Sequence, residues 1–386
     1  MKLKAPRIYP VILLVLTGLT VSFYAGRTAY AYHPFGSKML EVAMTGNVGG
    51  FFDDNITYAK SSKKSDWVTD LVAGLRATYT GKKHYLDLIA NDREQLYSRY
   101  SEFTNNSQDV RLDYRYDRTK YDRIGLKSSF RHYYSPEEFS DAFGRTNGQY
   151  AYTTSETDMT YTRDVSQRLS LTATAGMGIN ILDKKAGDNS SEIRAGASGV
   201  YSLSTKWSLL GAYDFSARKF KNGPSSTMHT ITGGTRFYFT DRLFWEGVGG
   251  LQIADNFSHQ IKLAPYIQTS LNGQIDKKTT GKILFSEYSE ATSYSQNMFN
   301  QWRASADLTR VLWKRLSAFV IAFYGRGEYK TINQKNDLLG ANGGLTYDFN
   351  EHFKAVAGYS FSMNSSNVNS NEYTKNVATA KIVFTF

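Results

Sequence analysis

Apolar and polar residues alternate one by one along much of this chain. In the run V-R-L-D-Y-R-Y-D, from Val110 to Asp117, every second residue is apolar and each residue between is charged. Successive side chains of a β-strand point to opposite faces, so this run predicts a strand with one apolar and one charged face. A row of four charges would be costly in a soluble core but is acceptable beside water. The same alternation is found in four further runs: Leu169–Ile181, Trp207–Arg218, Phe353–Ser362 and Val377–Phe386.

Turn residues divide the chain into strand-length segments, and the connections alternate between short and long. Short polar turns are expected near Gly81, Arg118, Asp164, Thr205, Asp241, Gly273, Lys314 and Asn350. Longer polar loops are expected at Asp53–Ser65, Ser101–Gln108, Ser135–Gly148, Asp183–Ser191, Lys221–Met228, Asp255–Gln260, Ser289–Asn300, Lys330–Asp337 and Met363–Lys375. This pattern predicts an all-β fold: a single closed antiparallel transmembrane β-barrel of about 18 strands (16–18). Its short turns and both termini would face the periplasm, and its long loops the cell exterior. A barrel of this size leaves an aqueous channel.

The two ends of the chain predict export to the outer membrane of a Gram-negative bacterium. Lys2, Lys4 and Arg7 precede the apolar run Val11–Val21, and Ala29-Tyr30-Ala31 offers a cleavage site. Residues 1–31 are therefore predicted to be a signal peptide and residues 32–386 the barrel. The alternative is a single membrane anchor, but the apolar run is shorter than a spanning helix needs. At the other end, Phe386 is predicted to be the C-terminal signal for the barrel-assembly machinery.

Composition agrees with a barrel among outer-membrane lipids. Tyrosine accounts for 28 residues and proline for only 6, which is typical of long strands with aromatic girdles at both interfaces. The absence of cysteine excludes thiol catalysis and Cys-ligated zinc. A net charge of +11 favours anionic solutes or lipopolysaccharide phosphates without choosing between them. No nucleic-acid partner is indicated.

The charged faces of the predicted strands are the candidate functional surface. Polar walls that bind solutes weakly suit an aqueous channel. The alternative is that these charges pair only to hold the inner wall together. The predicted lumen-lining residues are Asp70, Arg76, Arg111, Asp113, Arg115, Asp117, Asp214, Arg218, Arg303, Asp307, Lys354 and Lys381.

The third long loop is a candidate constriction. Ser135-Pro136-Glu137-Glu138 combines an N-cap residue, a proline suited to the first helical position and acids in the first turn, so a short helix is predicted. Folded inward, this loop would narrow the channel with Glu137, Glu138, Asp141 and Arg145. The alternative is an ordinary surface loop.

No arrangement of residues predicts an enzyme, a cofactor or a metal site. The six histidines are scattered over different segments, and none has a second ligand at metal-binding spacing. They are His33, His84, His132, His229, His259 and His352.

The ends of the predicted barrel resemble a known family. Gly46–Asn55, which contains Asp53-Asp54-Asn55, is followed by Ser65-Asp66, and the chain closes on Asn371–Phe386. These segments resemble the outer-membrane β-barrel porins associated with exopolysaccharide gene clusters. The resemblance implies a role in moving polysaccharide across the outer membrane, beside a periplasmic export protein. It brings no established functional residue. Asp53, Asp54 and Asn55 suggest either a calcium site or a solvated turn.

Three functions remain open from the sequence. The first is a channel that takes part in polysaccharide export, which rests on the resemblance. The second is a general or anion-leaning diffusion porin for small hydrophilic solutes, which the barrel pattern alone supports. The third is a scaffold barrel that sheaths a cytochrome in an electron conduit.

Overall fold

Eighteen β-strands make up most of the described part of the chain. The structure, a computed structural model, describes residues 39–134, 150–183, 188–223, 225–255, 261–292, 297–329 and 332–386. The strands are β1 (Leu40–Asp53), β2 (Asp66–Thr80), β3 (His84–Tyr97), β4 (Asn105–Asp117), β5 (Asp122–Tyr133), β6 (Tyr152–Asp164), β7 (Leu169–Leu182), β8 (Ser190–Ser202), β9 (Trp207–Phe220), β10 (Ser226–Thr240), β11 (Leu243–Asp255), β12 (Ile261–Gln274), β13 (Thr279–Thr292), β14 (Asn297–Trp313), β15 (Leu316–Tyr329), β16 (Gln334–Asp348), β17 (Phe353–Ser366) and β18 (Tyr373–Thr385). Two 3₁₀ helices, η2 (Ser101–Phe103) and η6 (Asn369–Asn371), lie in the connections.

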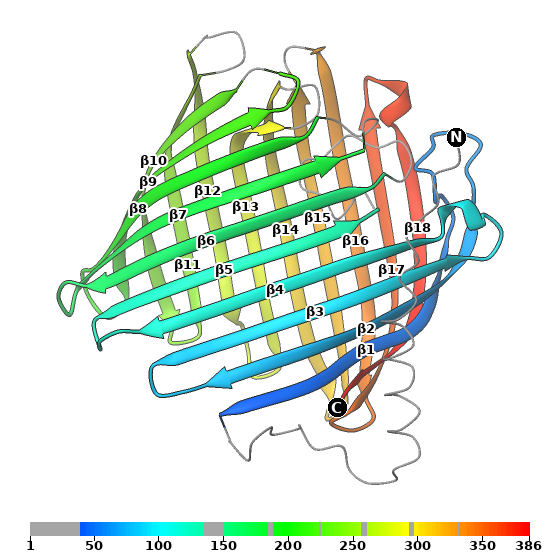
Figure 1. The fold of residues 1–386 in the computed structure, drawn as a ribbon, viewed down its shortest axis with the longest axis horizontal. Coiled ribbons are helices and arrows are strands. Elements are labelled where there is room, and N and C mark those ends of the chain that lie inside the picture. The colour runs from blue at the N-terminus through cyan, green and yellow to red at the C-terminus, as the bar shows by residue number, and fades with distance from the viewer. Residues whose placement is uncertain are drawn as a thin grey trace.

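The strands form one closed antiparallel sheet (Figure 1). Each strand pairs with its neighbours in sequence, and β1 also pairs with β18, from Thr45 opposite Thr385 to Asp53 opposite Val377. Closure satisfies the backbone groups that an open sheet would leave at its edges. The predicted all-β barrel of about eighteen strands is confirmed.

Short turns and long loops lie at opposite ends of the barrel. All eight predicted short turns are found at or next to their predicted positions, at the end where β1 begins and β18 stops. Some connections are shorter than predicted. β14 begins at Asn297 and β18 at Tyr373, inside the predicted loops Ser289–Asn300 and Met363–Lys375. These strand ends are rich in polar residues, so their composition resembles that of loops.

The outer surface is apolar, as the alternation predicts. Ile261, Leu263 and Trp313 expose 75%, 70% and 69% of their surface, which suits contact with lipid rather than water. Buried apolar residues form only small clusters near the long loops. No helix in the described ranges combines the length and the apolar character needed to cross a membrane.

Two predictions fall outside the described residues. They are the signal peptide at residues 1–31 and the constriction loop with Glu137, Glu138, Asp141 and Arg145. Both stay predictions.

Candidate functional site

Contacts between distant strands identify the inner face of the wall. Arg218 on β9 donates from Nη1 to the carbonyl oxygen of Ala291 on β13 at 2.5 Å, although three strands separate β9 from β13 in the sheet. Side chains on the outside of a closed cylinder diverge, so such a contact runs through the interior. Arg218 therefore faces inward, and so does Asp214, four residues before it on the same strand.

The strand registers carry this assignment around the barrel. Asp70 lies beside Gly49 and Gly49 beside Lys381, so residues on three strands share one row. By the same reasoning, all twelve predicted lumen residues lie on the face that Arg218 occupies. They come from β2 (Asp70, Arg76), β4 (Arg111, Asp113, Arg115, Asp117), β9 (Asp214, Arg218), β14 (Arg303, Asp307), β17 (Lys354) and β18 (Lys381). Their part in conducting solutes stays a prediction.

Opposite charges face each other on β2 and β3. Arg76 donates to both carboxylate oxygens of Asp87, at 2.8 and 3.0 Å. Nearer the long-loop end of the same two strands, Arg93 donates to Asp70 at 2.5 Å. A charged partner restrains each of these side chains and reduces its net field in the lumen. Asp87 and Arg93 were not among the predicted residues because a partner on another strand is known only once the register is known.

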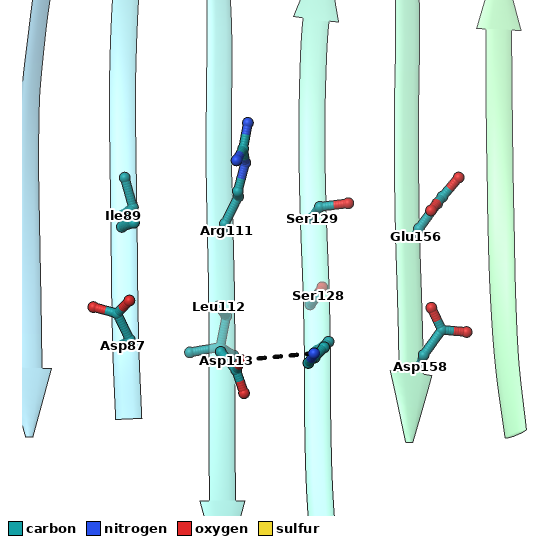
Figure 2. A pocket seen from close by; sticks show the side chains of 10 residues that line it. Asp87, Ile89, Arg111, Leu112, Asp113, Ser128, Ser129, Glu156 and Asp158 are labelled. Atoms are coloured by element: carbon teal, nitrogen blue, oxygen red, sulfur yellow. Dashed lines mark ion pairs between the residues drawn. The ribbon is translucent and has the colours of Figure 1, made fainter. Parts of the chain in front are cut away.

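The charged row of β4 continues this arrangement. Arg111 donates to Asp109 at 2.7 Å, and Asp113 lies 3.9 Å from Lys127 of β5. Figure 2 shows Arg111, Asp113 and the carboxylates of β3 and β6 on one side of the strands, with Leu112 behind them. These residues line a recess of about 370 Å³ between Asp87 of β3 and Asp158 of β6. The inner surface from β2 to β6 thus carries many paired charges that are accessible to water.

The inner face of β15 is aromatic instead. The ring of Phe323 lies against Gly340 of β16, where a Cβ would overlap it, and the guanidinium of Arg303 stacks over the same ring at 3.9 Å. Phe319 lies against Gly344 in the same way. Both rings therefore lie against glycines of β16, and the Arg303 guanidinium covers the ring of Phe323. The sequence analysis did not predict these contacts. Two phenylalanines four residues apart, Phe319 and Phe323, followed on the next strand by two glycines with the same spacing, Gly340 and Gly344, are a signal that could have indicated them.

The end of β13 leaves the barrel wall. β12 and β13 pair only from Gln274 opposite Thr280 to Ile267 opposite Glu287, whereas β13 and β14 pair as far as Thr292 opposite Asn297. Within the described residues, β13 beyond Glu287 therefore has β14 as its ladder partner but not β12.

A side chain of β11 forms hydrogen bonds with the part of the β13 backbone that does not pair with β12. The backbone N–H of Ser289 donates to Gln252 Oε1 at 2.7 Å, and Gln252 Nε2 donates to the carbonyl of Ser289 at 3.2 Å. Arg218 binds the carbonyl two residues further on. Ser289–Thr292 thus crosses the inner faces of β11 and β9, inside the barrel. Sequence reasoning predicted only an extracellular loop here.

The other strand of this hairpin is anchored on the opposite side. The rings of Phe299 on β14 and Tyr329 on β15 are 4.5 Å apart, both are buried, and Leu338 of β16 packs against them. Gly327 lies beside the pair, where a Cβ would overlap the Phe299 ring. We call residues Tyr288–Thr292 and Asn297–Gln301 the inner hairpin. Its β14 half stays in the ladder with β15 as far as Phe299 opposite Tyr329, and its β13 half is held to β9 and β11 by hydrogen bonds.

The residues that carry the family resemblance meet where the barrel closes. Asp53 and Lys375 form a buried ion pair at 3.1 Å, and Lys375 Nζ lies 3.8 Å from the centre of the Tyr58 ring. Asp54 accepts hydrogen bonds from the backbone and side chain of Asn376, at 2.7 and 2.6 Å. The loop after β1 is thereby bound to β18.

Asn55 completes this contact, and we call the contact of residues 53–55 with residues 374–376 the clasp. Its side chain donates to the carbonyls of Ala59 and Thr374, at 2.8 and 2.9 Å, and accepts from the Ala59 N–H. Asn55 is fully buried and Asp53 nearly so, so the expectation of a solvated turn is wrong. The loop packs over an apolar cluster, and this packing buries Asp53 and Asn55. Among the described residues, no group of three or more metal-ligating side chains is suitably arranged for an ion.

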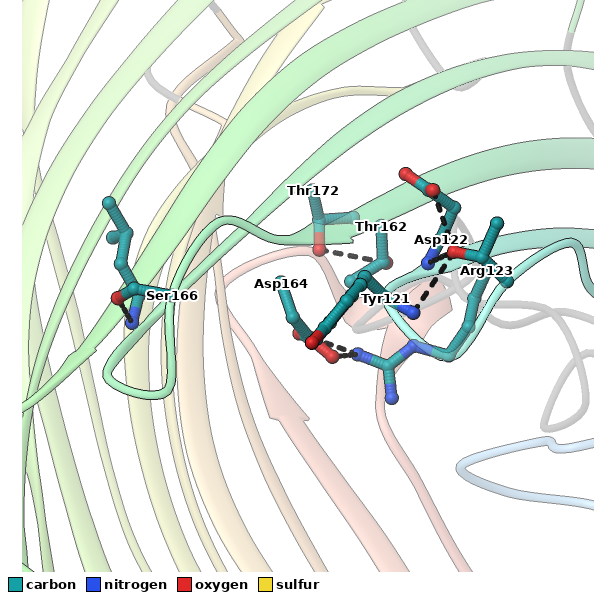
Figure 3. Close-up of polar contacts among 9 residues, drawn as sticks. Tyr121, Asp122, Arg123, Thr162, Asp164, Ser166 and Thr172 are labelled. Carbon is teal, nitrogen blue, oxygen red and sulfur yellow. Dashed lines mark hydrogen bonds and ion pairs between the residues drawn. The ribbon is translucent and has the colours of Figure 1, made fainter.

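Side-chain hydrogen bonds stabilise the short turns at the other end. Between β4 and β5, Thr119 Oγ1 accepts from the N–H groups of Tyr121 and Asp122, at 3.1 and 3.0 Å. Arg123 then donates to both oxygens of Asp164 on β6 (Figure 3). These bonds hold the turn in place, and this end of the barrel carries its own charge pairs.

Comparison with known proteins points to a single family. The sequence model of the family described as "Putative beta-barrel porin 2" matches residues 34–386. This confirms the likeness to outer-membrane β-barrel porins, whereas the link to exopolysaccharide gene clusters stays a prediction. No match is found among curated protein sequences.

Several solved barrels have a similar shape. OccAB3 of Acinetobacter baumannii is 11% identical, with 90% of this chain and 99% of that chain covered and a TM-score of 0.48. OpdQ of Pseudomonas aeruginosa is 10% identical, with 90% and 97% covered and a TM-score of 0.48. OccK2 (OpdF) of the same organism is 9% identical, with the same coverage and a TM-score of 0.47. These likenesses concern the barrel shape alone.

Proposed function

Because the chain belongs to this β-barrel porin family of the Gram-negative outer membrane, we propose that it is a passive channel for small hydrophilic solutes. The observation that carries the proposal is the charge-compensated inner wall. Paired acids and bases, such as Arg76 with Asp87 and Arg93 with Asp70, offer many polar contacts with little net field. A polar solute can exchange water for such contacts and leave again.

The inner hairpin favours small solutes over polymers. It crosses the barrel interior between Gln252 and Tyr329, so the passage is narrower than an empty eighteen-stranded barrel. The ring of Phe319, which lies against Gly344, adds an apolar group to the polar wall. Such a pairing of surfaces suits solutes with both hydroxyl groups and apolar ring faces, which sugars have.

Reconstitution tests this proposal. The refolded protein is placed in planar bilayers and in liposomes, and single-channel conductance is measured beside the swelling rates for sugars of increasing size. We expect steady conductance and a swelling rate that falls sharply between small and larger sugars. A correctly folded barrel that inserts without conducting would overturn the channel proposal.

Polysaccharide export is the second candidate, and the resemblance at the two ends of the chain favours it. Those residues form the clasp between β1 and β18. Their role in closing the barrel explains why they are present, and it gives no information about the transported molecule. An export role would require the inner hairpin to move or a periplasmic partner to act on the barrel.

Deletion in the native host separates the two candidates. Loss of extracellular polysaccharide with accumulation inside the envelope, restored by the intact gene, would favour export. Normal polysaccharide with slower uptake of small solutes would favour the diffusion channel. Purification of a stable complex with a multihaem protein would instead point to a scaffold barrel for a cytochrome.

A further inference from the structure

We propose that the inner hairpin is the constriction of the channel, and that the pore widens when the end of β13 returns to the wall beside β12. This inference rests on the proposed channel function and adds to it the element that sets pore size. It assigns Gln252 and Arg218 as positioning residues, because they bind the backbone of the hairpin from strands on the far side of β12.

The contacts of Gln252 are those that a neighbouring strand would make. Its amide donates to the carbonyl of Ser289 and accepts from the N–H of the same residue. A buried peptide group without such partners would be unfavourable. Gln252 is itself nearly fully buried, and its Nε2 also lies within 3.4 Å of Thr230 Oγ1. One side chain therefore replaces the ladder bonds that β13 gives up when it leaves the wall.

Arg218 supplies the second anchor. Its Nε donates to Ser190 Oγ of β8 at 3.1 Å, which leaves Nη1 directed at the carbonyl of Ala291. Arg218 is 7% exposed, so its position is defined by packing as well as by hydrogen bonds. Together the two anchors hold the β13 backbone at two nearby points, Ser289 and Ala291.

The wall offers a second position for the same segment. Along β12, Ile261–Tyr266 pairs with β11 on one side but not with β13 on the other. Extending the register from Ile267 opposite Glu287 would place Ser289 opposite Pro265 and Ala291 opposite Leu263. Returning there would exchange the bonds to Gln252 and Arg218 for ladder bonds to β12, and would clear the interior.

Pro265 explains why the wall position does not prevail. Proline has no N–H to give to a ladder, and within sheets it is confined to edges and bulges. Pairing of β11 with β12 continues through Pro265, so the missing donor falls on the side of β12 that faces β13. The re-formed ladder would lack a bond at its centre. Both positions of the hairpin therefore have partners for most of its backbone, which is the condition for a two-state element.

The first test removes one anchor without adding charge. We expect Q252L to raise single-channel conductance about twofold and to admit larger sugars in liposome swelling, because the hairpin loses two hydrogen bonds in the lumen position. The matched control is N272L, which also replaces an inner-face amide by leucine. Asn272 lies on β12 near the short turns, and its side chain donates to Ser270 Oγ at 2.7 Å, away from the hairpin. N272L is expected to conduct as the wild type does.

The second test uses the absence of cysteine from the chain. The pair L263C/A291C is expected to cross-link on oxidation and to trap the hairpin at the wall, with conductance above that of the wild type. Reduction with dithiothreitol is expected to return it to the wild-type value.

The outcomes separate the two levels of the account. If the wild-type barrel folds and inserts but does not conduct, the proposed function fails. If the wild type conducts while Q252L matches N272L, the hairpin is not the constriction. If L263C/A291C never cross-links, or does so with unchanged conductance, the return to the wall is excluded.

Discussion

At the residue scale, Asp53 and Lys375 form an ion pair in which both side chains are buried. The side chains expose 3% and 8% of their surface, and Lys375 also stacks over the Tyr58 ring. The pair joins the first strand to the last, so it acts where the barrel closes. Removing one partner would leave the other charged and buried, which is far less favourable than losing an exposed pair.

We therefore expect Lys375→Ala to lower the free energy of unfolding by about 3–5 kcal/mol. The matched control is Lys354→Ala, because Lys354 pairs with Asp348 at 3.5 Å while both side chains remain half exposed. That change is expected to lower stability by no more than about 1 kcal/mol. Urea titration of the barrel in lipid vesicles, followed by tryptophan fluorescence, measures both. Equal effects of the two changes would contradict the role of the clasp.

At the scale of elements, the base of the inner hairpin depends on a glycine. A side chain at Gly327 would overlap the ring of Phe299, which is 1% exposed and confined by Tyr329 and Leu338. We expect Gly327→Leu to destabilise the barrel by about 1–3 kcal/mol through overpacking. Gly211 on β9 faces outward, and a Cβ there would meet no atom within 4 Å, so Gly211→Leu should be neutral. The same urea titration compares them, and a neutral Gly327→Leu would show that the cluster is loosely packed.

The turn between β12 and β13 gives a dependence on pH. Asp276 accepts hydrogen bonds from the N–H groups of Lys278 and Thr279, at 2.7 and 2.8 Å, and from the Thr279 hydroxyl at 2.9 Å. These bonds to the charged form hold the pKa of Asp276 below its usual range. A depressed pKa contributes stability that is complete above the ordinary aspartate value and is lost as the pH falls through the folded value.

Asp276→Ala should therefore unfold at lower urea than the wild type at pH 7. The difference between the two should shrink as the pH falls below about 4. The unfolding midpoints of both proteins, measured from pH 7 to pH 3, check this. A difference that stays constant with pH would mean that the carboxylate does not stabilise the turn.

Strands and turns were predictable because their signals are local. The alternation in Leu169–Ile181 and the polar turn near Asp241 each lie within a few residues, and β7 and the β10–β11 turn are found there. The inner hairpin was not predictable in this way. Its position depends on Gln252 and Arg218, which lie 37 and 73 residues from their partners in the sequence. No periodicity within Ser289–Asn300 reports those contacts.

At the scale of the whole molecule, the inner wall carries both signs of charge in neighbouring rows. The row on β4 includes Arg111 and Arg115, whose side chains are more than half exposed to the lumen. Reversing both to Glu removes two positive charges and adds two negative ones. We expect the double variant to shift ion selectivity toward cations by roughly a few-fold. Reversal potentials in asymmetric KCl measure the shift, and an unchanged value would place this row outside the conducting path.

Part of the candidate site was predictable from the sequence. The alternation placed the twelve predicted charges on one face of their strands, because side-chain direction follows directly from position along a strand. Their partners, such as Asp87 and Lys127, could not be identified, because this requires the strand register. The register is set in part by the length of each turn, which the sequence gives only approximately. The clasp joins residues 322 positions apart, and only the closed barrel brings them together.

The most direct test of the account is the single-channel conductance of the refolded full-length barrel in a planar lipid bilayer. The charge-lined interior predicts discrete, steady conductance steps. The inner hairpin predicts steps smaller than those of an unobstructed barrel of this size, and larger ones in Q252L. Insertion of folded barrels with no conductance, in the wild type and in Q252L alike, would contradict the claim that this protein is a channel.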